Sequence, residues 1–401
     1  MNALRRQFFF SFGVIGSVMP LMTVFLRQEG GFSFLQIGLA ISLMNIPMLC
    51  SPALITLLAD RSIDPRRILA TAYTCSATVL TLLFFSPSIT ITLILFVFHG
   101  LAFVAMLPLQ DGFYFSLAQQ TARQGGAPPS YPLIRVWGTA GFILPSVLLY
   151  LPLSQGASPS SILPCAVGFC VLSLANSLTL PRITRFASPG GLPTRAAFAT
   201  ILGPNVRWLT LGLFFAFLGA ACYYAFIGNY FDEVVGIPKP YIGLIINFGV
   251  LLEIGFTLLM PRLQNLVRLK GILVLGLGYM VVRMVLLASS PTVFIAVATQ
   301  VLHGLEVLAL FIGPVMFINR LARDEFRNSI QGVFTMLVGG FGRVIGGVAG
   351  GLAVTEWGLA GGLWYAAAMV TIGFILVACF FSRIPPPEEQ VEESTLPSEV
   401  A

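Results

Sequence analysis

The sequence predicts an all-α integral membrane protein with twelve transmembrane helices arranged as two six-helix bundles. The first reason is composition: the 401 residues are 57% hydrophobic and 9% charged, whereas about 25% of the residues in a soluble domain are charged. The second is that the apolar residues form long runs, many of which approach the ~20 residues that a helix needs to cross a bilayer. The third is a single long polar break near the middle of the chain.

The apolar runs define twelve spans, several of them separated by short turn-like breaks such as Ser86 to Ser88 and Ser289 to Pro291. The first run follows Arg5 and Arg6, as in a signal peptide. It is longer than the about 7–15 residues of a signal-peptide core and no A-x-A-like site follows, so we expect a retained helix. The spans are predicted at residues 7–27, 34–58, 68–86, 89–112, 133–153, 160–180, 208–231, 241–260, 272–289, 292–318, 330–353 and 359–381.

The polar break from Pro181 to Arg207 divides the spans into six and six. We therefore expect four parts along the chain. These are an N-terminal bundle at 1–185, a cytoplasmic linker at 186–206, a C-terminal bundle at 207–383 and a tail at 384–401. The tail is rich in proline and glutamate, which is typical of disorder. Internal repeats of this kind are typical of secondary transporters.

Positive charge is unequal on the two sides of the predicted membrane protein. Seventeen of the 22 lysines and arginines fall on the side of the N-terminus, and only Arg27 and Lys239 fall in the opposite loops. This asymmetry places both termini in the cytoplasm, with the chain in the plasma or inner membrane. The basic residues are spread over many short loops, so the net charge of +6 does not indicate a nucleic-acid partner. The six cysteines lie in apolar runs without metal-ligand or disulfide spacing, and we expect neither a metal nor a cofactor.

Three ionisable residues, Arg283, His303 and Glu306, lie inside otherwise apolar runs. A charged side chain costs several kcal/mol at the bilayer centre, so it is usually retained for a pathway or a proton relay. A helix places His303 and Glu306 on one face, because they are three residues apart, and Arg283 lies in the preceding span. The three could handle a proton; the alternative is a structural polar cluster that holds helices together.

The other charged residues of the spans fit a central cavity between two bundles. Acids and bases are equal in number, as expected if buried charges must be paired. Arg135 offers a fork of donors, and Phe142 lies seven residues later on the same helical face, which suits a ring-bearing solute. Alternatively, Phe142 faces lipid. The acids are Asp111, Glu253 and Glu306, and the bases are Arg135, Arg283 and Arg343.

The loop after the second span carries a recognisable charge pattern. It contains Asp60 and Arg61, then Arg66 and Arg67. Together with six plus six spans and a polar linker, this pattern resembles the major facilitator superfamily. It departs from that signature at Thr56, where a glycine is usual. The residues themselves indicate either a charge latch between helix ends or a solvated loop.

Within that superfamily the chain resembles the lactose permease and phenylpropionate permease group of proton symporters. The stretch 108–113 is similar to one that carries a sugar-binding acid, which implies this role for Asp111, and the stretch 131–138 implies an equivalent role for Arg135. Phe142 falls on a sugar-stacking aromatic residue. The resemblance assigns Arg283, His303 and Glu306, with the displaced acid Glu253, to proton coupling, and Arg343 falls on a membrane lysine.

The seventh span departs from the group. It lacks the acids that pair this lysine in lactose permease, so Arg343 needs another partner, namely Glu253, Glu306 or the solute.

We therefore expect a proton-coupled symporter that imports a small organic solute by alternating access. Sugars, nucleosides and aromatic acids all fit the candidate residues. The partners would be the solute, protons and the lipid bilayer, with the chain acting as a monomer. The alternatives are a proton-driven exporter and a non-transporting membrane sensor. An enzyme is not expected, because the sequence has no H-E-x-x-H or G-x-S-x-G motif and no soluble catalytic domain.

Overall fold

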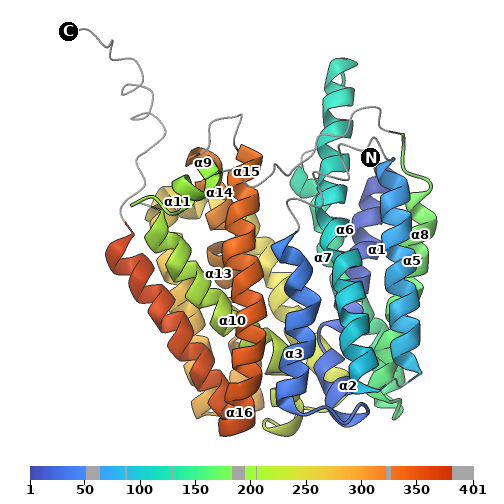
Figure 1. Cartoon of the computed structure of the whole chain (residues 1–401), viewed down its shortest axis with the longest axis vertical. Coiled ribbons are helices and arrows are strands. Elements are labelled where there is room, and N and C mark those ends of the chain that lie inside the picture. The colour runs from blue at the N-terminus through green and yellow to red at the C-terminus, as the bar shows by residue number, and fades with distance from the viewer. Residues whose placement is uncertain are drawn as a thin grey trace.

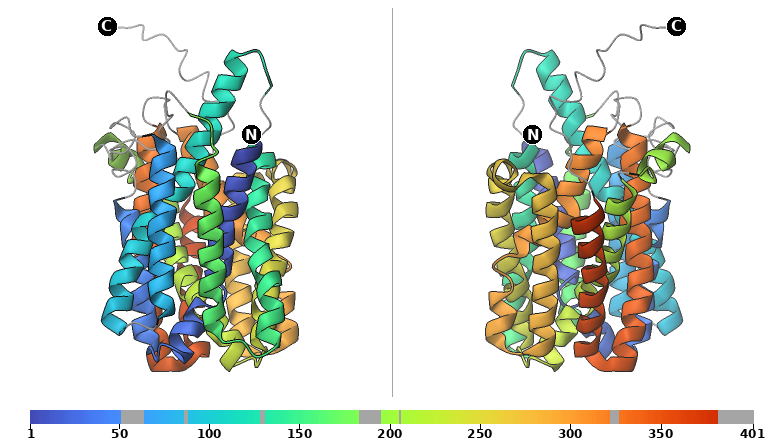
Figure 2. Two further views of the ribbon diagram at one scale, coloured as in Figure 1. Left: turned by 90° about the vertical axis from the view of Figure 1, so that its right-hand side faces the viewer. Right: turned by 90° about the vertical axis from the view of Figure 1, so that its left-hand side faces the viewer.

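The computed structural model describes residues 1–50, 64–85, 88–127, 131–182, 195–204, 206–321 and 327–381. Within these ranges the chain forms helices and no strand, and the helices stand side by side as two groups (Figure 1). The views in Figure 2 show that the long helices run nearly parallel to one axis. The N-terminus and the last described helix lie toward the same end, which we call the terminal end; the other is the far end.

Several helices of the N-terminal half begin at residues whose side chains cap the first turn. Ser33 and Gln36 form a capping box at the start of α3. Asp64 caps α5, which has Pro65 in its first turn, and Ser88 caps α6. The elements of this half are α1 (Asn2–Val18), α2 (Met22–Gln28), α3 (Phe34–Asn45), η1 (Ile46–Leu49), α5 (Pro65–Phe84), α6 (Ile89–Arg123), α7 (Tyr131–Ser154), η2 (Pro159–Ser161) and α8 (Ile162–Ser177).

The C-terminal half contains two very long helices and one span that is broken into pieces. Its elements are α9 (Arg195–Ile201), α10 (Arg207–Glu233), α11 (Lys239–Ser289), α12 (Val293–Ala298), α13 (His303–Val307), η3 (Leu308–Ile312), α14 (Gly313–Leu321), α15 (Arg327–Phe334), η4 (Thr335–Phe341), α16 (Gly342–Ile375) and η5 (Leu376–Phe380). The segments η3, η4 and η5 are π-helical.

The described residues account for the twelve predicted spans, except that residues 51–58 of the second span lie outside them. Eight helices are long and apolar enough to cross a membrane, and two of them are 51 residues long. Non-helical backbone divides each of these two, at Arg268 (φ 57°) in α11 and at Gly358 (φ 72°) in α16. The shorter apolar segments Phe34–Leu49 and His303–Ile318 complete the set. The predicted all-α fold is therefore confirmed.

Two spans differ from their predicted form. Helix α6 continues to Arg123 instead of ending at residue 112, and it projects beyond the bundle at the terminal end (Figure 1). Hydropathy ends where the side chains become polar, but the backbone hydrogen bonds of a helix do not require apolar side chains. The span predicted at 292–318 is interrupted between α12 and α13, where Gln300 bonds back to Val297 and His303 bonds back to Gln300. These i to i−3 bonds tighten the turn directly before His303.

Helix α16 joins the two halves through two glycine faces. Gly342, Gly346 and Gly350 pack on α10, where an added Cβ would meet residues such as Phe217 and Cys222. Gly347 and Gly351 pack on α3 of the other half. The small-xxx-small spacing therefore marks a close helix contact. The start of the predicted linker and the tail at 384–401 lie outside the described residues, and the described part of the linker includes α9.

Candidate transport site

The residues predicted for proton coupling meet in one buried cluster. The Arg283 guanidinium donates to Glu306 (Nη1 to Oε2, 2.8 Å) and to His303 (Nη1 to Nδ1, 3.1 Å). The side chain of Arg283 is 2% exposed and that of Glu306 is 0% exposed. An ion pair this far from water is stable only when its remaining hydrogen-bonding groups are also satisfied.

Neighbouring residues supply most of those hydrogen bonds, and among the described residues only the buried Arg283 Nε atom of the pair has no partner. Tyr224 from α10 donates to the second carboxylate oxygen of Glu306. Gln300 accepts from Arg283 (Nη2 to Oε1, 2.8 Å), and the Tyr223 ring lies under the guanidinium at 4.6 Å. Sequence reasoning missed the roles of the two tyrosines. The signal was their place in the seventh span, where the sequence departs from the acids expected by resemblance to lactose permease.

The backbone explains why these side chains converge. Arg283 lies on the second part of α11, which packs directly on α13. Glycine makes this packing close: an added Cβ at Gly276 would meet the backbone of Leu305, and one at Gly249 would meet Gln300 and His303. The tightened turn at 299–302 places Gln300 and His303 on the same side. The π-helical segment η3 follows within the same span, and such segments are common at functional sites.

A pocket adjoins this cluster. One wall is apolar and comes partly from the N-terminal half, with Met19, Pro20 and Phe142. The other wall is polar and comes from the C-terminal half, with Tyr223, Tyr224, Arg283, Gln300 and His303. Phe142, which was predicted to contact the solute, therefore lines the same pocket as the coupling residues. This pocket lies at the contact between the two halves.

The N-terminal candidates Asp111 and Arg135 lie outside this lining. Asp111 on α6 accepts a hydrogen bond from Tyr131 of α7 (Oη to Oδ1, 2.6 Å). Arg135 lies over the Phe12 ring at 4.1 Å and close to Tyr131. The two candidates are not in an ion pair with each other. Tyr131 stands between them, a bridging residue that sequence reasoning did not single out.

Arg343 and Glu253 do not meet in the structure. Arg343 donates to the Met48 sulfur (Nη1 to Sδ, 3.4 Å) and lies between the rings of Phe217 and Phe311. No acid among the described residues pairs with it. Glu253 is half-buried on α11 and makes no hydrogen bond or ion pair with a described residue, although the charges of His303 and Arg135 act on it.

The loop-signature residues are only partly described. Asp60 and Arg61 lie outside the described residues. Arg66 forms a 2.6 Å ion pair with Asp64, and its guanidinium holds the pKa of the Asp64 carboxyl below its ordinary value through hydrogen bonding. Arg67 is exposed. The partner of Arg66 is thus Asp64, a residue that the sequence pattern had not included.

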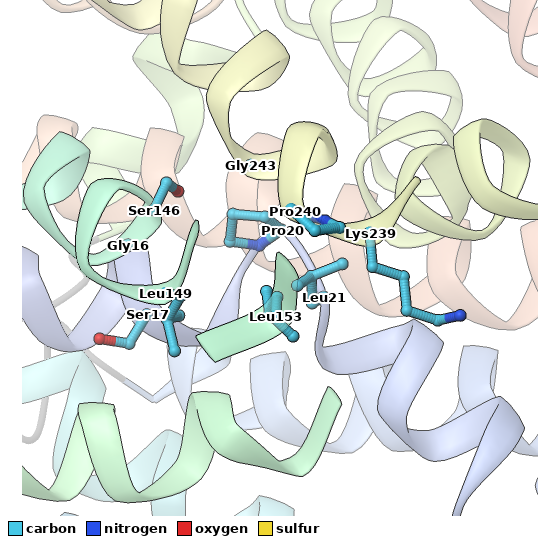
Figure 3. A pocket seen from close by; sticks show the side chains of 10 residues that line it. All are labelled: Gly16, Ser17, Pro20, Leu21, Ser146, Leu149, Leu153, Lys239, Pro240 and Gly243. Carbon is cyan, nitrogen blue, oxygen red and sulfur yellow. The ribbon is translucent and has the colours of Figure 1, made fainter. Parts of the chain in front are cut away.

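A second, smaller pocket lies between α1, α7 and the start of α11 (Figure 3). Ser17 and Ser146 lie on one side of it and Lys239 on the other (Figure 3). Next to it the two halves are joined by a hydrogen bond from Asn247 to Ser146 (Nδ2 to Oγ, 2.6 Å) and by the paired hydroxyls of Tyr150 and Tyr241 at 3.3 Å. These two contacts hold α7 of the N-terminal half against α11 of the C-terminal half beside the second pocket.

The fold and the buried charges point to one family of membrane transporters, and a comparison of sequences decides it. The model of the MFS_1 like family matches residues 2–366. The chain belongs to the MFS_1 like family. Proteins of this family, including the relatives below, are transporters, so the chain is a membrane transporter for small solutes and not an enzyme. The predicted resemblance to the major facilitator superfamily is confirmed.

Curated relatives align with this MFS_1 like protein over nearly its whole length. The xanthosine permease of Escherichia coli (strain K12) is 26% identical over 404 residues, which is 93% of this chain and 92% of the permease. The nucleoside permease NupG of the same organism is 24% identical over 406 residues, or 94% and 93% of the two chains. The maltose permease of Geobacillus stearothermophilus is 24% identical over 385 residues, with the same coverage. The lactose permease group is a looser comparison.

Solved structures confirm the architecture. The crystal structure of the nucleoside transporter NupG superposes with a TM-score of 0.80 at 21% identity and covers 95% of this chain and 99% of that one. A bacterial homologue of the human lysosomal transporter Spinster gives a TM-score of 0.72 at 13% identity, with 95% of each chain covered. At these identities the likeness concerns the fold, which is the twelve-helix fold predicted from the spans.

Proposed function

We propose that this transporter is a proton-coupled symporter that imports a nucleoside, or a similar ring-bearing solute, by alternating access. The observation that carries the proposal is that the buried ion pair and the pocket share residues. Arg283 and His303 line the pocket, and both lie against Glu306 behind it. In this proposal the chain is a monomer of the inner membrane, has both termini in the cytoplasm, and uses protons as its coupling ion without a further cofactor.

The shared residues link the proton to the solute. A proton on Glu306 removes the negative charge that holds Arg283 and leaves a buried guanidinium in need of another acceptor. A solute in the pocket can supply that acceptor, because Arg283 is part of the wall. A solute that prefers the protonated cluster must, by thermodynamic linkage, also strengthen proton binding. Arg283, His303 and Glu306, with Glu253 nearby, are therefore our coupling residues.

The choice of a nucleoside rests on pocket chemistry and on the relatives. The pocket combines aromatic and aliphatic side chains with a few polar groups, which is the composition typical of small-molecule sites. Phe142 supplies an aromatic surface for a ring. Two relatives are named as permeases for xanthosine and for nucleosides. We also assign Asp111, Arg135 and Arg343 to the solute path, through contacts that form during the transport cycle.

Transport by Glu306→Gln tests the coupling. We expect this variant to lose uphill uptake of radiolabelled uridine driven by a proton gradient, and to retain counterflow, which needs binding and movement of solute without net proton transfer. Glu356→Gln is the matched control, because Glu356 is an exposed acid at the end of the eleventh span. Normal accumulation by Glu306→Gln, or no uridine transport by the unmodified protein, would remove the proposal.

A further inference from the structure

The polar wall of the main pocket is rich in hydrogen-bond donors and has no carboxylate, and this restricts the solute. The wall contains Arg283, Gln300 and His303 together with two tyrosines, and no Asp or Glu of the described residues is part of it. Glu306 lies behind the wall with no exposed surface. Its oxygens accept from Arg283 and Tyr224, so the carboxylate is not available to a solute.

Arg283 fixes which nitrogen of His303 carries the proton. An arginine side chain only donates, so the His303 Nδ1 atom that lies 3.1 Å from Arg283 Nη1 must accept. The distance from Nδ1 to Glu306 is 3.7 Å, too long for a competing hydrogen bond. The proton of the neutral ring is therefore on Nε2. No described residue accepts a hydrogen bond from His303 Nε2–H. The Nε2 atom is also not fully buried.

The same reasoning orients Gln300. Because Arg283 Nη2 donates to the Gln300 oxygen, the amide nitrogen must point away from the guanidinium. One N–H donates to the backbone oxygen of Ala296 at 3.2 Å. The second N–H interacts with the hydroxyl of Tyr223, another residue of the pocket wall. His303 and Gln300 are three residues apart on either side of the tightened turn, so one short stretch of the wall carries the unpartnered His303 Nε2–H and the Gln300 amide beside it.

Arg343 places a second positive charge near the polar wall of the pocket. It lies on α16 next to η4, and its neighbours are a sulfur and two aromatic rings instead of an acid. Its charge also acts on Tyr224, which belongs to the pocket wall. Within the predicted spans the described C-terminal half thus holds two guanidinium groups and two carboxylates, of which Glu306 is engaged behind the wall and Glu253 is half-buried on α11 outside the pocket lining.

From this donor wall we propose that the pocket selects nucleosides whose base carries an exocyclic carbonyl toward α13, and discriminates against those that carry an amino group there. The inference rests on the proposed function and names its substrate class. A carbonyl oxygen has two lone pairs: it can accept from His303 Nε2–H and, in place of the Tyr223 hydroxyl, from the Gln300 amide. An amino group at the same position would place donors against donors and leave buried N–H groups unpaired.

Matched pairs of nucleosides test this directly. Uridine and cytidine carry a carbonyl and an amino group at the same exocyclic position, and inosine and adenosine differ in the same way; in each pair the adjacent ring nitrogen changes from donor to acceptor. We would measure their affinities for the purified protein by calorimetry and their competition against labelled uridine in vesicles. The carbonyl member of each pair is expected to bind about tenfold more tightly or better, because an unpaired buried donor costs on the order of a factor of ten or more.

A substitution in the wall separates recognition from coupling. Gln300→Glu keeps an oxygen facing Arg283 and replaces the amide donor with an acceptor, so the ratio of uridine to cytidine affinity should fall by at least about threefold. Gln264→Glu is the matched control, because Gln264 lies on α11 outside the pocket and contacts Met316. Melting temperatures of both variants show whether they are folded.

The outcomes distinguish the two proposals. If nucleosides are bound and accumulated by a proton gradient but both members of each pair bind equally, the carbonyl preference is wrong and the symport proposal stands. If no nucleoside binds, both are wrong. If Gln264→Glu lowers the ratio as much as Gln300→Glu does, the preference does not arise at this wall, and the inference is overturned.

Discussion

The two halves of this transporter bury polar side chains in different ways. In the N-terminal half a chain of neutral groups links four helices: Asn176 donates to Gln7 at 2.7 Å, and Tyr73 bonds with Ser11 at 2.6 Å and with Gln110 at 3.0 Å. In the C-terminal half the buried group is an ion pair with its own set of hydrogen bonds. The comparison teaches that a buried polar residue indicates a working site when it is charged and adjoins a pocket.

The two histidines show the same contrast. His99 is 5% exposed, bonds with Ser76 (Nδ1 to Oγ, 3.0 Å) and stacks near Phe103. His303 is 8% exposed but contacts both members of the ion pair and lines the main pocket. The two histidines are therefore buried to a similar extent, but their neighbours differ. His99 is a packing residue, whereas His303 connects the pocket to Glu306.

The largest effect should come from breaking the ion pair from one side. Arg283→Met leaves the Glu306 carboxylate buried without its cation, which should reduce the free energy of unfolding by about 3–5 kcal/mol. Adding Glu306→Gln should restore most of that loss, because the buried charge is then gone. Chemical denaturation of the single and double variants in detergent measures both values.

The neutral hydrogen-bond network of the N-terminal half provides the control for the Arg283 and Glu306 variants. Gln110→Met in the N-terminal half removes a buried partner of Tyr73 without exposing a charge, and should cost about 1–3 kcal/mol. Additive losses in the Arg283 and Glu306 variants, with no recovery in the double variant, would show that the C-terminal cluster behaves like the neutral network.

An intermediate effect is expected from the charged residues of the N-terminal half. If Asp111 and Arg135 contact solute during transport, alanine at either position should weaken uridine binding by more than about tenfold, since it leaves a polar partner unsatisfied. Calorimetry on the purified variants measures this. Tyr131→Phe separates the roles, because it removes the 2.6 Å hydrogen bond to Asp111 and leaves both charges in place. Normal affinity with a lowered melting temperature in both alanine variants would assign the pair to structure alone.

The smallest effect should follow from His99→Gln. This substitution can keep a hydrogen bond to Ser76 and should change the free energy of unfolding by about 1 kcal/mol. Uptake of uridine and its dependence on external pH should match the unmodified protein, while His303→Gln changes both. An altered pH profile in His99→Gln would show that the N-terminal half also takes part in proton movement.

Much of the fold could be predicted because a bilayer requires long apolar helices, and the spans record that requirement directly. The spacing of His303 and Glu306 also placed them correctly on one face. The break at 299–302 could not be predicted, because hydropathy does not report whether a backbone bonds to i−3, i−4 or i−5. The partner of Arg343 was expected to be an acid or the solute; Met48 and two aromatic rings surround it, and apolar neighbours leave no charge pattern in the sequence.

The most direct test of proton coupling through the C-terminal cluster is to follow external pH when solute enters without an applied gradient. Uridine is added to lightly buffered, de-energised vesicles that contain the protein, and the external pH is recorded. The unmodified protein should make the medium more alkaline as protons enter with uridine, and Glu306→Gln should give no change while still exchanging labelled uridine. Entry of uridine without alkalinisation, or a normal pH change with Glu306→Gln, would contradict the account.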